Sequence, residues 1–222
     1  LYLSSDCNVA KVESQSEVGS TATVLEIALD VYMGRREVSY KWDSDDNSDS
    51  QQQCITTSHL IPKKWPSCLL IQPKRFGFDK ETLEKYKVSN KEGVFTFPPV
   101  LDLNSRGGGM YNLRSVVMHS GTATDGHYFC YSHVGGSSST SLSSTRQWAL
   151  LDDDCVTLCS QKRVFYEAAS ASTCDFNLNR DAGAEVGVID EEEEDEWTVD
   201  SDTNAYMLFY SKVTEDGCDE EL

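Results

Sequence analysis

The sequence predicts an α+β domain built mainly on antiparallel β-sheet, and three observations support this class. Short apolar or alternating segments are separated by turn-forming residues, and long helical patterns are rare. The most regular of these segments follow one another closely between residues 111 and 152, as in a β-meander. A 10% aromatic share in 222 residues provides enough bulk for a substantial core.

The meander is the clearest local pattern of the chain. It comprises three predicted strands, at residues 111–119, 127–134 and 147–152. A glycine-bounded turn at 121–126 joins the first two strands. The two-residue period of a strand places His127, Phe129, Tyr131 and His133 on one face of the second strand. Adjacent strands therefore bring His127 close to Asp152, although 25 positions separate them.

The other elements are less regular. Further strands are expected at 23–31, 68–72, 94–97 and 205–213. The alanine and leucine content of residues 23–31 is also compatible with a helix, which is the alternative prediction for this segment. Residues 35–42 are predicted to form a short helix. Pro73 lacks a backbone donor, so the strand before it should bulge or lie at an edge there.

Several polar segments are predicted to be loops or insertions outside the core. They are a mobile loop at 43–53, a serine-rich loop at 135–146, an acidic insertion at 170–203 and an acidic tail at 214–222. The insertion ends in the run Asp190–Glu196, whose like charges repel one another.

The net charge of −18 limits the possible partners. Nucleic acid and an anionic membrane surface are unlikely partners, because both are bound through clustered Lys and Arg. The acidity is compatible with a basic or polar protein partner, although it also serves solubility alone. No apolar stretch approaches the ~20 residues that span a bilayer.

The N-terminal residues and the cysteines both bear on the cellular location of the protein. The first residues contain no signal-peptide pattern, and the missing initiator Met indicates residues upstream. The eight cysteines contain no Cys-x-x-Cys pair. We expect mostly reduced thiols in an intracellular protein, of the cytoplasm or the nucleus, with no metal and no cofactor.

His127 and Asp152 are the candidate catalytic residues. A nucleophilic hydrolase needs a base that accepts a proton at one ring nitrogen and an acceptor that fixes the other. A lone histidine is more often a surface or satisfied core residue, but the neighbouring carboxylate favours function. For Asp154, a simple role in capping the turn is the better interpretation. The same alternative is weaker for Asp153, which we retain as a supporting site residue.

No convincing nucleophile accompanies this pair. Cys155 follows three aspartates, whose field disfavours a thiolate. Cys130 lies on the opposite face of its strand from His127. The remaining cysteines have ordinary surroundings, and the serines lie in flexible tracts without a Gly-x-Ser-x-Gly elbow.

The ordered motifs resemble those of the ubiquitin-specific proteases. Five segments carry this resemblance: Leu69–Phe76, Phe95–Leu103, Tyr111–Tyr128, Trp148–Val156 and Asn204–Leu208. The first looks like the palm strand of that family, and the last three look like its histidine box and closing strand. The match is good over 65–213 and weak over 20–42.

The resemblance implies a papain-like α+β fold of thumb, palm and fingers, with the thumb missing. Residues 1–64 would be part of the fingers and 65–213 the palm. It also implies thiol-dependent hydrolysis of the isopeptide bond after the terminal Gly of ubiquitin, with ubiquitin and ubiquitinated proteins as partners. His127 would be the general base and Asp152 its orienting group, with Asp153 nearby. Positions that line the channel for the ubiquitin tail match Phe76, His119 and Tyr128.

Two departures from the family pattern matter. The cysteine box, with its nucleophile and oxyanion-stabilising Asn, is absent, so this chain alone is expected to be inactive. The zinc-binding Cys-x-x-Cys pairs of some fingers are absent as well, and Pro73 replaces a usual Leu. A non-catalytic ubiquitin-binding module is the alternative function. An unrelated β-rich interaction domain is a third, weaker possibility.

Overall fold

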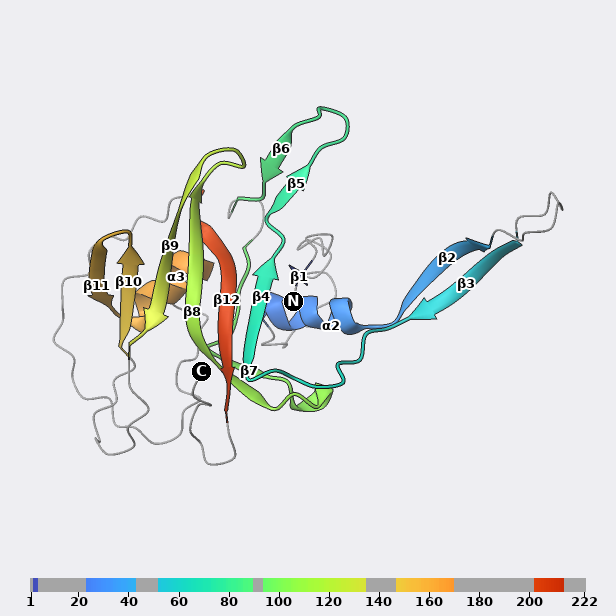
Figure 1. Cartoon of the computed structure of the whole chain (residues 1–222), viewed down its shortest axis with the longest axis horizontal. Helices are drawn as coiled ribbons and strands as arrows, with labels where there is room; N and C mark the ends of the chain where they lie inside the picture. Colours follow the sequence, from blue (N-terminus) through green and yellow to red (C-terminus); the bar gives the residue numbers. More distant parts are fainter. Residues whose placement is uncertain are drawn as a thin grey trace, which may run out of the picture.

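A central, mostly antiparallel sheet organises the molecule (Figure 1). The computed structural model describes residues 2–3, 23–42, 52–89, 94–134, 147–169 and 202–213. The strand order is β1-β4-β12-β8-β9-β10-β11, and β7 pairs with one end of β8. The strands are β1 (Tyr2–Leu3), β4 (Cys68–Pro73), β7 (Val100–Asp102), β8 (Met110–Gly121), β9 (Gly126–His133), β10 (Trp148–Asp152), β11 (Cys155–Cys159) and β12 (Asn204–Lys212). Every pairing is antiparallel except that of β1 with β4.

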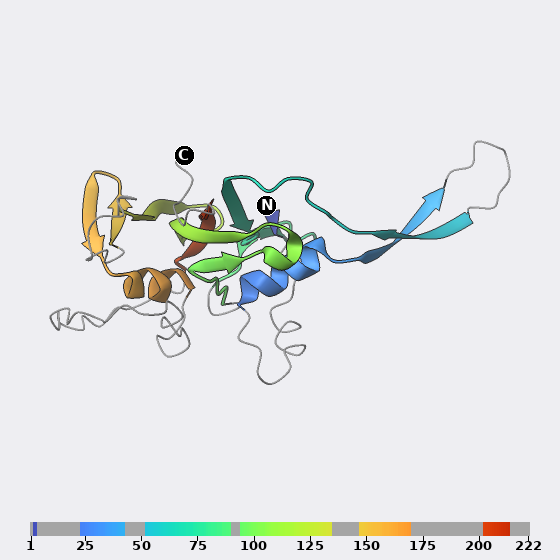
Figure 2. The same ribbon diagram turned by 90° about the horizontal axis from the view of Figure 1, so that it is seen from below.

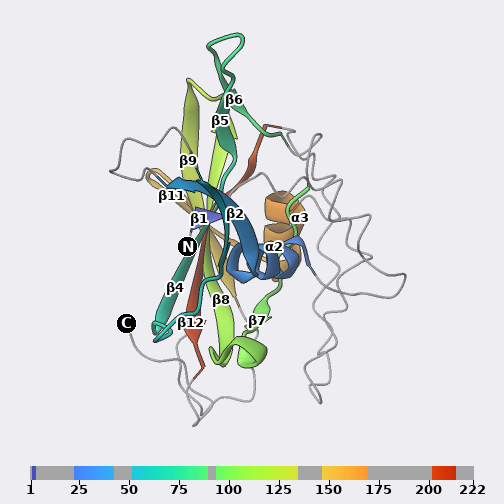
Figure 3. The same cartoon turned by 90° about the vertical axis from the view of Figure 1, so that its right-hand side faces the viewer.

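Two helices, α2 (Val24–Met33) and α3 (Gln161–Ala169), cover one face of this sheet (Figures 2 and 3). The core lies between the helices and the sheet. Its fully buried side chains include Leu25, Leu29, Ile71, Val116, Tyr131 and Leu208. Neither helix of the described residues is long and apolar enough to cross a membrane.

Helix α2 replaces the strand expected at 23–31, where the sequence had left a helix open. Thr23 and Glu26 form a capping box: the Thr23 Oγ1 accepts from the Glu26 N–H at 3.4 Å, and Glu26 accepts from the Thr23 N–H at 2.7 Å. Leu25, Ala28 and Leu29 then form a buried stripe at helical spacing. The capping box and this stripe together favour the helix over the strand.

The segment around Thr96 explains why residues 94–97 form no strand, contrary to the prediction. The Thr96 carbonyl accepts from the N–H of Leu25 at 3.0 Å, and its hydroxyl accepts from the N–H of Val24 at 2.9 Å. The segment therefore satisfies the exposed donors at the N-terminus of α2 instead of pairing in the sheet.

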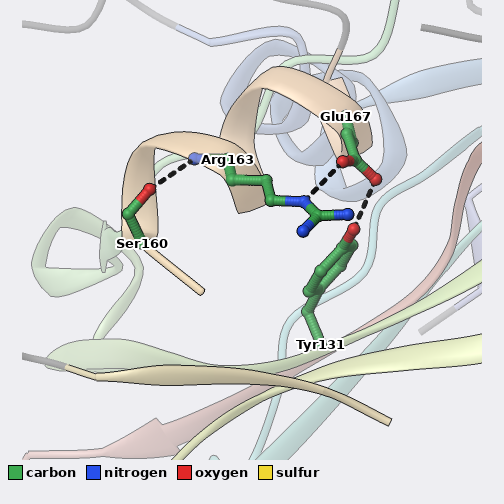
Figure 4. A network of polar contacts seen from close by, with 4 residues as sticks. All are labelled: Tyr131, Ser160, Arg163 and Glu167. Carbon is green, nitrogen blue, oxygen red and sulfur yellow. Dashed lines mark hydrogen bonds and ion pairs between the residues drawn. The ribbon is translucent and has the colours of Figure 1, made fainter. Parts of the chain in front are cut away.

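Helix α3 is fixed to the sheet by a polar network (Figure 4). The Arg163 Nε donates to Glu167 Oε1 at 2.8 Å, one helical turn away. The buried Tyr131 of β9 donates its hydroxyl to the other oxygen of Glu167. Burial and this carboxylate raise the pKa of Tyr131. At the start of the helix, Ser160 Oγ accepts from the Arg163 N–H at 3.2 Å.

Two hairpins extend beyond the sheet. The first, β2 (Arg36–Trp42) and β3 (Gln52–Ser58), projects far from the body (Figures 1 and 2). The second comprises β5 (Phe76–Phe78) and β6 (Lys85–Lys87). The helix predicted at 35–42 is therefore wrong. Strand β2, which covers 36–42 of this segment, is paired along its whole length with β3, a partner that local periodicity does not reveal.

The strands predicted at 68–72, 111–119, 127–134, 147–152 and 205–213 are confirmed, with small differences at their ends. Pairing of β4 with β12 reaches Ile71, and Pro73 beyond it pairs only with β1, in keeping with the expected interruption. Gln52 and Gln53 belong to β3 rather than to the predicted loop. The rest of that loop, the serine-rich loop, almost all of the acidic insertion and the acidic tail lie outside the described residues.

Candidate active site

The structure brings His127 and Asp152 together. The register of β9 and β10 aligns Cys130 with Leu151, so the next residue of β10 lies diagonally across from His127. The His127 Nε2 lies 2.5 Å from the Asp152 Oδ1. Both side chains are accessible, with 48% and 43% of their surface exposed. Because the carboxylate occupies Nε2, the other ring nitrogen, Nδ1, is the one positioned to accept a proton from a nucleophile.

Nearby carboxylates raise the pKa of His127 above its ordinary 6.5. The hydrogen bond to Asp152 is the largest cause of this increase. Partial desolvation of the ring lowers the pKa, and the negative charges of Asp152 and Asp153 raise it further. The imidazolium form is therefore stabilised, as a base that must carry a proton during a reaction requires.

Asp153 occupies the turn between β10 and β11 in the left-handed region, with φ of 47°. Aspartate tolerates this conformation better than most residues. One atom each of His127, Asp152 and Asp153 that could coordinate a metal ion lies within 4.8 Å of the other two. Exposed acidic groups are commonly this close without a metal, and Asp152 is already hydrogen-bonded to the imidazole.

The three residues expected to bind substrate meet in one aromatic cluster, which we define as Phe76, His119, Tyr128 and Tyr206. The His119 ring lies 5.1 Å from that of Phe76, edge to face, and 4.7 Å from that of Tyr128. The ring of Tyr206 lies 5.2 Å from that of Tyr128 and 5.8 Å from that of Phe76. The site prediction missed Tyr206, although it stands in the Asn204–Leu208 motif.

His119 is enclosed by this cluster and is only 4% exposed. Its Nδ1 is buried without a hydrogen-bond partner among the described residues. Burial and the charge of Lys87 lower the pKa of His119, so the ring favours its neutral form. Gly126 permits this packing, because a Cβ there would approach the His119 Nε2 to 2.2 Å. In contrast to His119, half of the Tyr128 side chain is exposed.

No cysteine belongs to the group formed by His127, Asp152 and Asp153 within the described ranges. The Cys130 Sγ lies 2.9 Å from the Ser115 Oγ of β8, in keeping with the predicted opposite face. Cys155 is exposed at the start of β11. Burial raises the pKa of the Cys159 thiol. The four cysteines whose side chains are described are all free thiols: Cys68, Cys130, Cys155 and Cys159.

Comparison with known proteins identifies the class. Residues 3–210 match the family model described as ubiquitin carboxyl-terminal hydrolase, so the chain belongs to this family of ubiquitin-specific cysteine proteases. A Saccharomyces cerevisiae relative, ubiquitin carboxyl-terminal hydrolase 15, is 27% identical over 168 residues, which are 68% of this chain and 12% of the relative. The chain thus spans about an eighth of that relative's length.

Solved structures confirm the papain-like α+β fold of this family. The yeast SAGA DUBm superposes with a TM-score of 0.53 at 18% identity, over 95% of this chain and 34% of the other. The SAGA DUB module that contains Ubp8 bound to monoubiquitin gives 0.50 at 20% identity, over 84% and 32%. The family match also rules out the third possibility, an unrelated interaction domain.

Proposed function

We propose that the chain is the histidine- and aspartate-bearing part of a deubiquitinating cysteine protease. The reaction is hydrolysis of the isopeptide bond after the terminal Gly of ubiquitin. The 2.5 Å contact between His127 Nε2 and Asp152 Oδ1 carries this proposal, because it orients an accessible imidazole as a base. The family match and the ubiquitin bound in the similar Ubp8 structure support ubiquitin as the substrate.

The proposed chemistry divides among three groups. His127 Nδ1 accepts the thiol proton of a cysteine, and the thiolate attacks the carbonyl carbon of the terminal Gly. The imidazolium returns the proton to the leaving lysine amine as the C–N bond breaks. Water, deprotonated by the same imidazole, then hydrolyses the thioester and regenerates the thiol. Asp152 holds the ring throughout, and Asp153 adds negative charge that favours the imidazolium.

We propose that the nucleophile comes from polypeptide outside this chain. Two observations support this view: the group around His127 contains no described cysteine, and the chain covers only about a third of the similar Ubp8 chains. The sheet face away from the helices also carries exposed apolar side chains. They are Leu70, Leu151, Val156 and Leu158, each between 37% and 67% exposed.

Those side chains lie on the face opposite the core by register. Leu150 pairs with the buried Tyr131, so the adjacent Leu151 points away from α3 and pairs with Val156. Of these side chains, Leu151, Val156 and Leu158 are neighbours on the paired strands β10 and β11, and exposed apolar clusters of this kind are commonly covered by other polypeptide. We therefore expect the isolated chain to be marginally stable or prone to aggregation.

The aromatic cluster is the proposed binding site for the ubiquitin tail. Phe76, Tyr128 and Tyr206 are partly exposed around the buried His119, so the cluster can contact an extended peptide from one side. We propose that the closely spaced rings receive a glycine backbone, which has no side chain to place among them. This accounts for a substrate that ends in Gly.

A ubiquitin–fluorophore assay tests the proposal on two proteins: residues 1–222 and the complete product of the gene. We expect no turnover by the chain alone, and turnover by the complete protein that is lost in the His127→Ala variant. Turnover by residues 1–222 that is abolished by one cysteine substitution would overturn the external nucleophile. A complete protein with full activity as His127→Ala would overturn the catalytic role of His127.

A non-catalytic ubiquitin-binding module is the second candidate, because the described residues contain no cysteine beside His127. The same two proteins distinguish it. Ubiquitin binding by the complete protein without any turnover, unchanged by Asp152→Asn, would favour the module over the protease.

A further inference from the structure

We propose that Lys87 is a positioning residue that holds the aromatic cluster in its binding shape. The inference rests on the proposed function, in which this cluster receives the ubiquitin tail. Lys87 makes no contact of its own with the reacting atoms in this scheme. It acts through the main chain of the elements that carry the four rings.

The Lys87 ammonium lies at a point where three backbone carbonyls converge. Its Nζ donates to the carbonyl oxygens of His119 at 3.0 Å, Gly121 at 2.9 Å and Asp202 at 2.5 Å. An ammonium has three N–H donors, so all of its capacity is used on main-chain acceptors. Two of these acceptors, His119 and Gly121, belong to the end of β8, and the third, Asp202, precedes β12.

Each ring of the cluster lies on an element that is paired with Lys87 or with one of its acceptors. Phe76 is the register partner of Lys87 across the β5–β6 hairpin, and His119 supplies one of the three carbonyls. Tyr128 is the register partner of His119 on β9. Tyr206 follows on β12, where the side chain of Asn204 donates to the Val88 carbonyl at 3.1 Å, next to Lys87.

Without the ammonium, the β5–β6 hairpin would lose three hydrogen bonds that join it to β8 and to Asp202, just before β12. A neutral side chain of the same length removes this donor from all three carbonyls. The Asp202 carbonyl keeps the Gly121 N–H at 3.2 Å, whereas the partly buried carbonyls of His119 and Gly121 lose a charged donor, which favours water and local opening. The rings would then separate, since edge-to-face contacts between them are each weak. The charge of Lys87 has a second consequence, because its removal raises the pKa of His119.

The chain offers a matched control. Lys85 belongs to the same strand β6, has the same charge and is exposed, and its register partner is Phe78. Lys87→Met and Lys85→Met remove equal charge from the same hairpin, so a difference between them isolates the convergence of carbonyls on Lys87.

The experiment compares the two variants in kinetics, ubiquitin binding and NMR. In the complete enzyme, we expect Lys87→Met to raise KM for ubiquitin–fluorophore at least about tenfold, or 1.4 kcal/mol, with kcat within about threefold. In the same enzyme, we expect Lys87→Met to weaken ubiquitin binding similarly, to raise the pKa of His119 and to weaken the ring-to-ring NMR contacts between His119 and Tyr128. We expect Lys85→Met to match the wild type in each.

Three results would overturn the inference: an unchanged KM, equal changes in the two variants, or a fall in kcat without a change in KM. If the wild-type enzyme does not bind ubiquitin, the proposed function fails, and the ring contacts of His119 still decide whether Lys87 orders the cluster. Should Lys87→Met not fold, Lys87→Gln keeps two donors on a shorter side chain. It is expected to shift the same quantities in the same direction by less.

Discussion

The His127–Asp152 pair and the aromatic cluster are built from neighbouring residues of β9 but differ in completeness. The pair is about half exposed and depends on a single hydrogen bond between two side chains. The cluster encloses His119 among three other rings, and its backbone is hydrogen-bonded to Lys87. The proposed catalytic pair is thus open to a further reacting group, whereas the proposed binding cluster is already assembled.

Strand geometry explains how adjacent residues serve both regions. Successive side chains of β9 point to opposite faces, so His127 turns toward Asp152 while Tyr128 turns toward His119. Gly126 precedes them and lies against the His119 ring. The β8–β9 turn therefore couples the two regions, and substitutions at each can show how far they act independently.

Asp152→Asn should produce the largest effect by breaking the catalytic pair. The amide cannot stabilise the imidazolium, and it accepts from Nε2 less well, so the base loses both orientation and charge support. We expect kcat/KM of the complete enzyme to fall by roughly 10³–10⁴-fold, judged by comparable triads. Ubiquitin binding by the cluster should be nearly unchanged. Asp153→Asn is the control, with an expected fall of about tenfold or less; equal losses in both variants would contradict the assignment.

Gly126→Ala should damage the cluster next most strongly. A Cβ at this position would lie 2.2 Å from His119 Nε2 and 2.6 Å from the Ser120 carbonyl oxygen. Because one of these atoms is backbone, the strand must shift, at a cost of about 1–3 kcal/mol in the free energy of unfolding. Chemical denaturation measures this difference.

The control for that variant is Gly107→Ala. Gly107 has φ of 71° with nothing within 4 Å of an added Cβ, so its substitution tests backbone strain alone. We expect a cost of about 1 kcal/mol there, and unchanged ubiquitin binding. Weaker ubiquitin binding by Gly126→Ala than by Gly107→Ala would show that the β8–β9 turn affects binding by the aromatic cluster. Equal binding in the two variants would show that the turn and the cluster act independently.

Tyr131→Phe should have a smaller effect, on the support behind the catalytic pair. The variant keeps the buried ring and its contact with Phe129 at 5.9 Å, but removes the hydroxyl that donates to Glu167. A hydrogen bond to a charged group contributes about 1.5–3 kcal/mol, reduced here because Arg163 still contacts Glu167. We expect a loss of about 1 kcal/mol in thermal or chemical unfolding. A stability equal to wild type would show that the network does not anchor α3.

The sequence predicted the meander well because its evidence is local. Alternation along β8 and β9, with glycines at the turn between them, is sufficient to place His127 opposite the end of β10. The helix predicted at 35–42 failed for the opposite reason: its strand character depends on pairing with 52–58. The strand predicted at 94–97 is wrong because Thr96 in this segment binds a helix terminus 72 positions away in the chain instead of another strand.

The candidate site shows the same difference between residues with a local sequence signal and residues whose contacts are long-range. His127, Asp152, Phe76, His119 and Tyr128 were predictable because residue type and motif spacing carry their chemistry. Tyr206 belongs to the Asn204–Leu208 motif, but the sequence alone indicates no binding role for it. Its ring contacts arise only because β12 lies between β4 and β8 in the sheet. Lys87 gave no signal, because its partners are backbone carbonyls that every sequence has.

The smallest expected effect is a pH dependence that distinguishes the two carboxylates near His127. The pKa of His127 is raised chiefly by its hydrogen bond to Asp152, and Asp153 contributes the smallest increase. NMR titration of the imidazole should therefore show a lower midpoint in both variants, with Asp153→Asn shifted less than Asp152→Asn. The reverse order would mean that charge rather than the hydrogen bond controls this group.

The raised pKa also fixes the sign of the stability change with pH. The folded state binds the His127 proton more tightly than the unfolded chain, whose histidine titrates near 6.5. The pair therefore stabilises the fold fully below that pH, and this contribution disappears as the pH rises through the folded pKa. The Tm difference between wild type and Asp152→Asn should be larger at pH 5.5 than at pH 8.5. An equal difference at both would show that Asp152 supports the turn into β11 rather than the charged form of His127.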